Sequence, residues 1–404
     1  MRILVVSQYF WPENFRINDI VIGLQQKGHI ITILTGHPNY PTGNFAEGYS
    51  GFNVKEELYN NMRVIRVPLF PRGQKSGIKL ALNYFSFALS GSVYALLCLK
   101  NDYDCIFVYE PSPMTVGFPA MALKWKIKKP IIFYIQDLWP DSLVATGFVK
   151  NSLVLKAVEY MVKIIYHACD RILVTSKAFI PKVHQLGYPL ESIKYLPQYA
   201  EEFYRPLEVD ATDSVHSILP EGFKIIFAGN MGTAQDLFTV LNAARDTMAD
   251  KINWVFIGDG SVREAMKTEV ANRKIDNVYF LGSFPAEMMP VFFSRADALL
   301  VSLNNDALFA LTIPAKLQSY LACGKPILAM LDGEGATIVY ESGAGLVVPP
   351  GNSNKLASTA RDLKKMTTEA RQNLGKNSRQ YYEREFERSI ILSNLDDIFD
   401  SVRV

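Results

Sequence analysis

Residues that could bind a phosphate lie in the segment 225–242, IIFAGNMGTAQDLFTVLN. Its first four residues are uniformly apolar and predict a buried strand, and later residues have helical spacing that predicts a helix beginning near Gln235. The turn between strand and helix contains Gly229, Asn230 and Gly232. Such a turn leaves backbone N–H groups at a helix N-terminus, where aligned peptide dipoles stabilise an anion. The segment predicts a nucleotide-phosphate site, although glycine turns also serve simply as connections.

Similar loops follow the next apolar runs of the second half. Gly258-Asp259-Gly260 follows one run, and Leu281-Gly282 ends the next. A later run leads to Lys316, one or two residues inside a predicted helix. A lysine there can neutralise a diphosphate, whereas the positive end of a helix otherwise disfavours a lysine. We therefore interpret Lys316 as a ligand-binding residue rather than a surface lysine.

The elements that must position these residues form a regular series of apolar runs separated by helical segments. Many runs are rich in Val and Ile and uniformly apolar, which is typical of parallel strands buried on both faces. The predicted strands are 2–7, 30–35, 63–67, 105–109, 131–135, 172–175 and 193–196, then 225–228, 254–257, 278–281, 298–302, 326–330 and 345–348. The fold class is α/β, with two doubly wound Rossmann-like domains facing a central cleft. Ligands bind outside the carboxyl ends of such strands.

Length and composition agree with two globular domains. A chain of 404 residues usually forms more than one domain. The interrupted segment 199–222 divides a domain over 1–200 from a domain over 201–380, and a charged amphipathic helix over 381–404 is expected to pack back across both. The four cysteines form no C-x-x-C pair, which fits a reducing cytoplasm, and we expect no secretory leader. Residues 1–200 carry a balance of +8 and the remainder −6, so the first half favours an anionic partner or simply has a charged surface.

Longer motifs identify the chain as similar to a known family. In the second half these are GNMGTAQ, GDG, IPAKLQSYLACGKPI and ESGAGLVVPPGN, and in the first half VVSQYFWPENFR, YEPSP and IQDLWPDS. Together they resemble glycosyltransferase family 4, the retaining, nucleotide-sugar-dependent family with the GT-B fold. The combination of PENFR, QDLWPDS and IPAKLQSY is similar to L-fucosamine transferases of O-antigen and capsule assembly. The resemblance covers nearly the whole chain.

The resemblance implies roles for individual residues. The turn Gly229 to Gly232 would approach the donor diphosphate and Lys316 would be its basic partner. The nucleoside would be lined by Gly258, Gly260, Leu281 and Gly282. From the other half, the acceptor side would present Phe10 to Glu13, Glu110 and Asp137. We expect Asp137, Lys316 and Glu110 to be the catalytic residues.

Two departures from the family pattern concern the sugar and the ribose. Gln136 stands where many members have a histidine before the acidic residue. The usual pair of glutamates is absent, and the ribose-binding one would fall near Ser319, which has no carboxylate. Glu334, in the next loop, could substitute for it or could simply occupy a surface turn.

The implied reaction is retaining transfer from a UDP-sugar, with N–H groups and a lysine stabilising the departing diphosphate. We expect no metal and no other cofactor. The D-x-D motif Asp102-Tyr103-Asp104 precedes the strand 105–109, at the wrong end for the ligand, and is interpreted as a turn.

The acceptor is expected to be a saccharide linked to undecaprenyl diphosphate, at an anionic membrane surface. Residues 80–99 carry no charge and are compatible with a membrane span, a packed domain helix or a helix at the interface. The basic cluster 124–129 around Trp125 favours the interfacial interpretation. The predicted location is the cytoplasm, peripheral at the inner face of the membrane. No signature accompanies this short cluster, so we do not expect nucleic acid binding.

Two other functions remain open on the sequence. A nucleotide-sugar 2-epimerase would need a histidine and carboxylates near the sugar, and His37 follows a predicted strand and is a candidate. A catalytically silent scaffold in a polysaccharide assembly complex would account for the missing glutamates.

Overall fold

The computed structural model describes residues 1–74, 76–145, 149, 151–208, 215 and 217–402. The chain divides into two compact units. Unit 1 comprises Met1–Leu196 together with Leu392–Val404, and unit 2 comprises Pro197–Ile391. The boundary between the units therefore lies four residues before the one expected at 200, and the last part of the chain belongs to unit 1.

Unit 1 contains an eight-stranded sheet in the order β3-β4-β2-β1-β5-β6-β7-β8. Its strands are β1 (Arg2–Val6), β2 (Ile30–Gly36), β3 (Lys55–Tyr59), β4 (Met62–Val67), β5 (Cys105–Glu110), β6 (Ile131–Ile135), β7 (Arg171–Val174) and β8 (Ile193–Tyr195). All neighbours pair in parallel except β3, which is antiparallel to β4. The sequence interpretation missed β3, because this edge strand, KEELY, carries charge instead of an apolar run.

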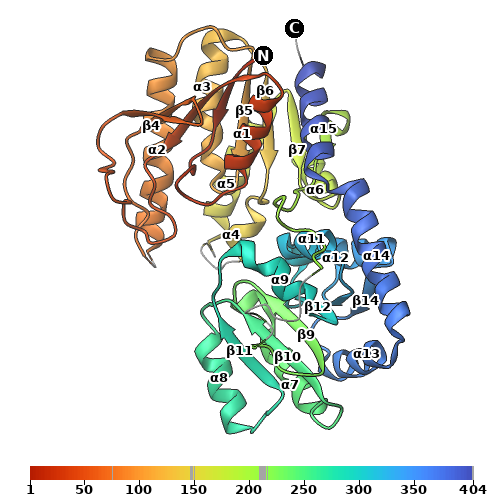
Figure 1. Cartoon of the computed structure of the whole chain (residues 1–404). Helices are drawn as coiled ribbons and strands as arrows, with labels where there is room; N and C mark the ends of the chain where they lie inside the picture. Colours follow the sequence, from red (N-terminus) through yellow and green to blue (C-terminus); the bar gives the residue numbers. More distant parts are fainter. Residues whose placement is uncertain (75, 146–148, 150, 209–214, 216, 403–404) are drawn as a thin grey trace. The chain divides into compact units, whose positions relative to one another are not determined.

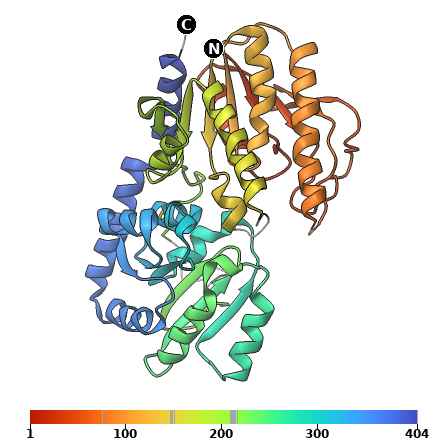
Figure 2. The same ribbon diagram turned by 180° about the vertical axis from the view of Figure 1, so that it is seen from behind.

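Helices cover both faces of this sheet. They are α1 (Ile17–Gln26), α2 (Gly77–Leu97), α3 (Gly117–Ile127), α4 (Asp141–Ala145), α5 (Ser152–Ala168) and α6 (Phe179–Gln185), with the short 3-10 turns η1 (Met114–Val116) and η2 (Leu190–Ser192). One face carries α2, α3 and α5, and α1 lies on the other (Figures 1 and 2). The topology reverses at β1, which lies between β2 and β5. The loops after β1 and β5 therefore flank the position where such folds bind ligands.

Unit 2 contains a fully parallel six-stranded sheet in the order β11-β10-β9-β12-β13-β14. Its strands are β9 (Phe223–Ala228), β10 (Ile252–Ile257), β11 (Val278–Gly282), β12 (Ala298–Ser302), β13 (Ile327–Met330) and β14 (Gly345–Val348). Counted within the unit, this is the order 3-2-1-4-5-6 of dinucleotide-binding folds. The reversal falls between β9 and β12, the strands that precede the glycine turn and the Lys316 segment.

Two apolar clusters cover the two faces of the unit 2 sheet. The connecting elements are η3 (Thr233–Gln235), α7 (Leu237–Asp246), α8 (Arg263–Asn272), η4 (Ala286–Met288), α9 (Met289–Ser294), α10 (Ala307–Ala310), α11 (Ala315–Ala322), α12 (Gly333–Ser342), α13 (Ser353–Lys365) and α14 (Thr368–Glu385). Helices α7, α8 and α13 pack on one face and α9, α11, α12 and α14 on the other. Successive residues of β9 point to opposite faces of the sheet: Phe227 lies in the cluster with α7, and Ala228 lies in the cluster with α11.

The C-terminal segment is two helices and not the one that the sequence predicted. Helix α14 ends at Glu385, and α15 (Arg388–Ser401) follows. Within unit 1, α15 packs against α1 and β5: Phe399 makes an edge-to-face contact with Phe107, and Asp396 lies 2.8 Å from Nε2 of His29. A Cβ on Gly23 would stand 2.3 Å from Leu392, so this glycine lets the two helices approach closely. The segment thereby completes the core of unit 1.

Candidate functional site

The glycine turn follows β9 at the reversal point of the unit 2 sheet. Gly229 has φ +130°, a conformation that favours glycine. Two of the turn's N–H groups hold the next loop: Gly229 N donates to Ile257 O (2.9 Å) and Met231 N to Asp259 O (2.7 Å). Among the described residues, the N–H groups of Asn230 and Gly232 donate to no backbone carbonyl. These two donors are thus the ones left for a ligand.

Gly258 and Gly260 have a packing role that the sequence did not reveal. A Cβ on Gly258 would stand 2.1 Å from Gly229 O, and a Cβ on Gly260 would stand 2.4 Å from Met231 O. No real side chain fits at such distances. The glycines therefore let the loops after β9 and β10 lie backbone against backbone, which fixes the shape of the turn from Gly229 to Gly232.

Lys316 lies against this turn, as expected. It is the second residue of α11, and its Nζ donates to Oε1 of Gln235 (2.7 Å) and lies 3.7 Å from the centroid of the Phe227 ring. The side chain also borders Gly229, where an added Cβ would stand 3.7 Å from Nζ. Burial lowers the pKa of Lys316 to about 7, because desolvation disfavours the charged form. Among the described residues no carboxylate pairs with this ammonium group, so an anionic ligand would restore its charge.

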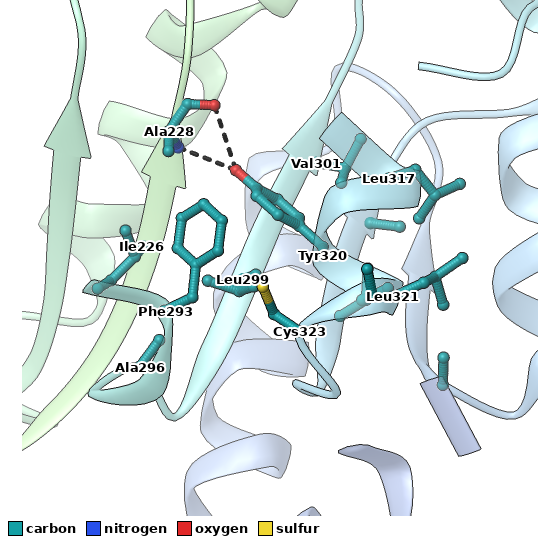
Figure 3. Packing of buried hydrophobic residues seen from close by; sticks show 14 of the residues in the cluster. Ile226, Ala228, Phe293, Ala296, Leu299, Val301, Leu317, Tyr320, Leu321 and Cys323 are labelled. Carbon is teal, nitrogen blue, oxygen red and sulfur yellow. Dashed lines mark hydrogen bonds between the residues drawn. The ribbon is translucent and has the colours of Figure 1, made fainter. Parts of the chain in front are cut away.

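Tyr320 fixes α11 to the end of β9. One turn after Lys316, its hydroxyl donates to Ala228 O (3.3 Å) and accepts a hydrogen bond from Ala228 N (2.9 Å), immediately before the glycine turn (Figure 3). The ring packs edge-to-face on Phe293 (Figure 3). Tyr320 was not predicted as part of the site, since the sequence showed only an apolar helix position. It sets the position of the lysine relative to the turn.

Gln235 positions the lysine and does not begin the helix. Thr233–Gln235 form a 3-10 turn, and α7 begins at Leu237, two residues later than predicted. Ser302, at the end of β12, donates from Oγ to Gln235 O (2.7 Å). Asn304 N donates to Ala234 O (2.9 Å), and its Oδ1 is buried without a hydrogen-bond donor. Asn304 is therefore a further candidate for ligand contact that the sequence placed only in a loop.

The remaining residues that were predicted to bind the sugar donor lie at the same edge of the unit 2 sheet. Gly282 O accepts from Gly258 N (2.7 Å), and Leu281 packs partly buried against the α11 side of the core. Glu334 lies in the first turn of α12, and a Cβ on its neighbour Gly335 would stand 3.3 Å from Pro314, the residue that precedes α11. The start of α12, which contains Glu334, therefore lies next to the start of α11, which contains Lys316.

The carboxyl edge of the unit 1 sheet presents acidic side chains. Glu110 ends β5 and is fully buried, and neither carboxylate oxygen has a partner with good hydrogen-bond geometry. Burial, reinforced by the nearby charge of Asp137, raises the pKa of Glu110 well above its usual range, because both disfavour the charged form. Burial also raises the pKa of Asp137 to about 6, against the opposing hydrogen bond from Ser142. The fold brings both predicted carboxyl groups together after β5 and β6.

The loop after β1 is built differently from the expectation. Phe10 and Glu13 were expected to face the acceptor, but both are buried. The carboxylate of Glu13 accepts from the N–H groups of Asn39 (2.7 Å), Tyr40 (2.7 Å) and Phe10 (3.2 Å). Glu13 therefore ties the loops after β1 and β2 to each other, which is a structural role.

His37 is likewise enclosed. Its Nε2 lies 2.8 Å from Asn53 O, the ring is flanked edge-on by Phe45 and Tyr49, and burial lowers its pKa. This environment gives His37 no access to a sugar, which weakens the epimerase hypothesis. His216 lies outside the described residues.

Two other sequence features have structural roles. In the D-x-D motif, Asp104 accepts a hydrogen bond from Arg2 N (2.7 Å) and Asp102 pairs with the Arg2 guanidinium, at the amino end of the sheet. In the basic cluster, Lys124 bonds to Asp170 and Lys126 donates to Leu99 O (2.7 Å), while Trp125 is 73% exposed. Two lysines of the cluster therefore bond to other residues of unit 1.

Comparison with known proteins matches both halves of the chain to family descriptions. Residues 16–198 match "Glycosyltransferase Family 4" and residues 210–381 match "Glycosyl transferases group 1". The Escherichia coli protein WcaI, whose name assigns it to colanic acid biosynthesis as a glycosyl transferase, is 26% identical over 337 residues, 80% of this chain and 82% of WcaI. WbjE of Pseudomonas aeruginosa, named as a glycosyltransferase, is 25% identical over 258 residues, 61% of this chain and 62% of WbjE.

Solved structures share the fold at low identity. Anabaena HepE, in complex with UDP and glucose, superposes with a TM-score of 0.71 at 14% identity, over 99% of this chain and 100% of HepE. Sucrose-phosphate synthase from Thermosynechococcus elongatus gives a TM-score of 0.75 at 18% identity, over 99% of this chain and 98% of that one. These similarities concern the two-domain architecture.

Proposed function

Since the chain belongs to the family 4 glycosyltransferases with the GT-B fold, we propose that it is a retaining enzyme that takes its sugar from a UDP-sugar. The proposed acceptor is a saccharide on undecaprenyl diphosphate, in O-antigen or capsular polysaccharide assembly. The name of WcaI, which refers to colanic acid biosynthesis, supports a role in polysaccharide synthesis, and the name of WbjE supports a glycosyltransferase. The transferred sugar we propose is N-acetyl-L-fucosamine, supported by the resemblance of the PENFR, QDLWPDS and IPAKLQSY motifs.

One observation carries the donor half of this proposal: a desolvated lysine without a carboxylate partner among the described residues, seated on a glycine turn at the sheet reversal. A diphosphate at this turn would meet the N–H groups of Asn230 and Gly232 and the ammonium of Lys316. These groups stabilise the charge that develops as the diphosphate leaves. Glu334 would hold the ribose in place of the missing glutamate.

The same arrangement lets a protein cation do what a divalent metal does elsewhere. We therefore propose that donor binding and transfer need no metal and no other cofactor. A chelator such as EDTA should leave UDP affinity and turnover unchanged. A requirement for Mg²⁺ or Mn²⁺ would contradict this part of the proposal.

In the acceptor half, we propose that Asp137 accepts a hydrogen bond from the attacking hydroxyl while the buried Glu110 shapes its surroundings. Retention follows if the hydroxyl attacks from the side on which the diphosphate leaves and the diphosphate takes up the proton. The anomeric configuration of the product, measured by NMR, tests this directly. An inverted product would contradict it.

A location in the cytoplasm, peripheral at the inner face of the membrane, is proposed from α2. Among the described residues it is the one helix long and apolar enough to cross a membrane. Within unit 1, 28% of its 18-residue apolar stretch is buried. Its outer stripe exposes large apolar side chains: Ile78, Leu82, Phe85, Leu89, Val93 and Leu97. Replacing Phe85 by Ser should weaken binding to anionic vesicles by about tenfold, since one buried aromatic contributes up to a few kcal/mol. Equal binding by both proteins would argue against this contact.

The decisive experiment is binding of UDP and GDP, without metal, to the wild type and to Lys316→Ala. We expect selective UDP binding that weakens about 100-fold in the variant, because a charged hydrogen-bonding partner of the diphosphate is lost. Lys224→Ala is the matched control, since Lys224 Nζ donates to Gly222 O at the opposite end of β9. Its affinity for UDP should be unchanged.

The outcomes also separate the alternatives. Absence of nucleotide binding to the wild type would refute the transferase and favour the scaffold. Inversion of a free UDP-sugar without an acceptor would favour the epimerase, although the enclosure of His37 argues against it.

A further inference from the structure

An apolar groove runs along α2 on the side next to β4. It has a volume of about 500 Å³, within the range of small-molecule sites. Its lining is shared by α2, the chain that leaves β4 and the segment that precedes β3, with Phe52, Val54, Leu69, Phe70, Leu89 and Val93 as the large apolar side chains. Leu69 is buried and forms the floor, whereas Phe52 and Leu89 are 73% and 69% exposed at the rim.

The groove offers almost no free polar groups, because its hydroxyls are used within the fold. Ser86 Oγ accepts from Phe70 N (2.9 Å) and donates to Asn83 O (3.0 Å). Ser90 Oγ donates to Pro68 O, and the Tyr94 hydroxyl donates to Glu56 (3.1 Å). What remains is an elongated apolar surface, suited to a hydrocarbon chain and unsuited to a sugar or a polar peptide.

A cation, Arg72, follows the groove residue Phe70 by two positions, just outside the groove lining. Two linked buried amides hold this segment: Asn83 Nδ2 donates to Phe70 O (2.6 Å) and to Asn39 Oδ1 (3.3 Å), and Asn39 Oδ1 also accepts from Arg72 N (3.1 Å). The Arg72 guanidinium lies 5.0 Å from the ring centroid of Tyr40 and 6.0 Å from that of Tyr9. Within the described part of the chain it forms no ion pair with a carboxylate.

From these two features we infer that the groove binds the hydrocarbon chain of a phosphate-headed isoprenoid lipid, with Arg72 facing the phosphate. The inference rests on the proposed function, since that lipid is its acceptor carrier. The groove borders the outer stripe of α2 and shares Leu89 and Val93 with it, whereas Phe52, Val54, Leu69 and Phe70 belong to the groove alone. A guanidinium is well suited to a phosphate, because its planar set of donors matches the phosphate oxygens.

The test uses farnesyl diphosphate as probe, with saturating UDP present to fill the donor site, and measures its affinity by calorimetry. Val54→Asp places a carboxylate in the groove at a position that is already 44% exposed, so folding should survive. We expect about tenfold weaker binding in Val54→Asp and also in Arg72→Gln. Leu82→Asp, which is 50% exposed on the outer stripe, is the matched control and should bind like the wild type.

Three results would overturn the inference. One is undiminished binding of farnesyl diphosphate to Val54→Asp. Another is equal affinity for inorganic pyrophosphate and farnesyl diphosphate, which would leave the groove without a role. The third is a Val54→Asp defect in binding to phosphatidylcholine vesicles but not to farnesyl diphosphate, which would assign the groove to the bilayer. UDP binding is measured in the same proteins. A refuted lipid-binding role of the groove can therefore be distinguished from a refuted UDP-binding role of the donor site.

Discussion

Both sheets reverse their strand order near the middle, but the side chains at their carboxyl edges have opposite chemistry. In unit 2 the strand reversal holds a lysine and free N–H groups, with Lys316 on Gln235 and Phe227. In unit 1 the corresponding edge holds two carboxyl groups, Glu110 and Asp137, both with raised pKa values. The architecture fixes where a ligand binds, and the side chains after each strand decide whether that ligand is an anion or a hydroxyl-bearing acceptor.

The two edges also differ in how their shape is kept. The unit 2 edge depends on backbone approach at Gly258 and Gly260, where no side chain fits. The unit 1 edge depends on a buried carboxylate, Glu13, that accepts three backbone N–H groups. Substitutions at one edge should therefore affect donor binding, and substitutions at the other should affect acceptor chemistry.

The largest expected effect is on turnover. Asp137→Asn should lower kcat by about 100-fold, since it removes a hydrogen bond from the attacking hydroxyl to a charged group, and such bonds contribute about 1.5–3 kcal/mol. UDP affinity should not change, because Asp137 belongs to the other unit. Steady-state kinetics and calorimetry on the same preparation check both parts. Loss of UDP binding in this variant would contradict the proposal that unit 2 binds the donor while Asp137 of unit 1 acts on the acceptor.

The next largest effect is expected on stability and UDP binding, from a change beside the glycine turn Gly229 to Gly232. Gly258→Ala should reduce the free energy of unfolding by about 2–3 kcal/mol and weaken UDP binding, because its Cβ would collide with Gly229 O. Gly222→Ala is the matched control: it also has positive φ, at +88°, but its Cβ would meet nothing closer than 3.7 Å. Urea unfolding and UDP titration of both variants separate the collision from backbone strain. Equal losses would show that the collision is unimportant.

The pH dependence should have opposite signs at the two edges. Donor binding requires the charged lysine, so UDP affinity should fall as pH rises above about 7, by less than tenfold per pH unit, and the fall should vanish in Lys316→Ala. Turnover requires the ionised carboxylate, so kcat should fall as pH drops below about 6 and become flat in Asp137→Asn. A UDP affinity that rises with pH between about 7 and 9 would contradict the lysine assignment.

The smallest expected effect is that of Glu110→Gln. Burial raises the pKa of Glu110 and so favours its protonated form, which has nearly the same shape as an amide. Stability should therefore change by less than about 1 kcal/mol and kcat by only a few-fold. Thermal unfolding and turnover at pH 7 provide the check. A defect as large as that of Asp137→Asn would show that Glu110 acts as a carboxylate, so that the unit 1 edge would hold two charged groups instead of one.

Helix α2 shows where sequence reasoning reaches its limit. Its polar residues Asn83, Ser86 and Ser90 bond to neighbouring loops of unit 1. Most of its large apolar residues are exposed, whereas Phe87 is buried. By contrast, α13 in unit 2 has the usual pattern, with Leu356 and Leu363 buried in the core. Composition alone does not reveal which side of a helix meets the sheet.

The sequence by itself determined the parallel strands and the placement of Lys316 and the glycine turn at one edge, because buried strands and tight turns each need residues of one kind. The GT-B family followed from the resemblance of its longer motifs. Only the tertiary structure showed that Tyr320 fixes the lysine helix, that Gly258 and Gly260 serve backbone approach, and that Phe10, Glu13 and His37 are enclosed. Those outcomes depend on residues distant in sequence, whose contacts, burial and pKa values exist only once the chain has folded.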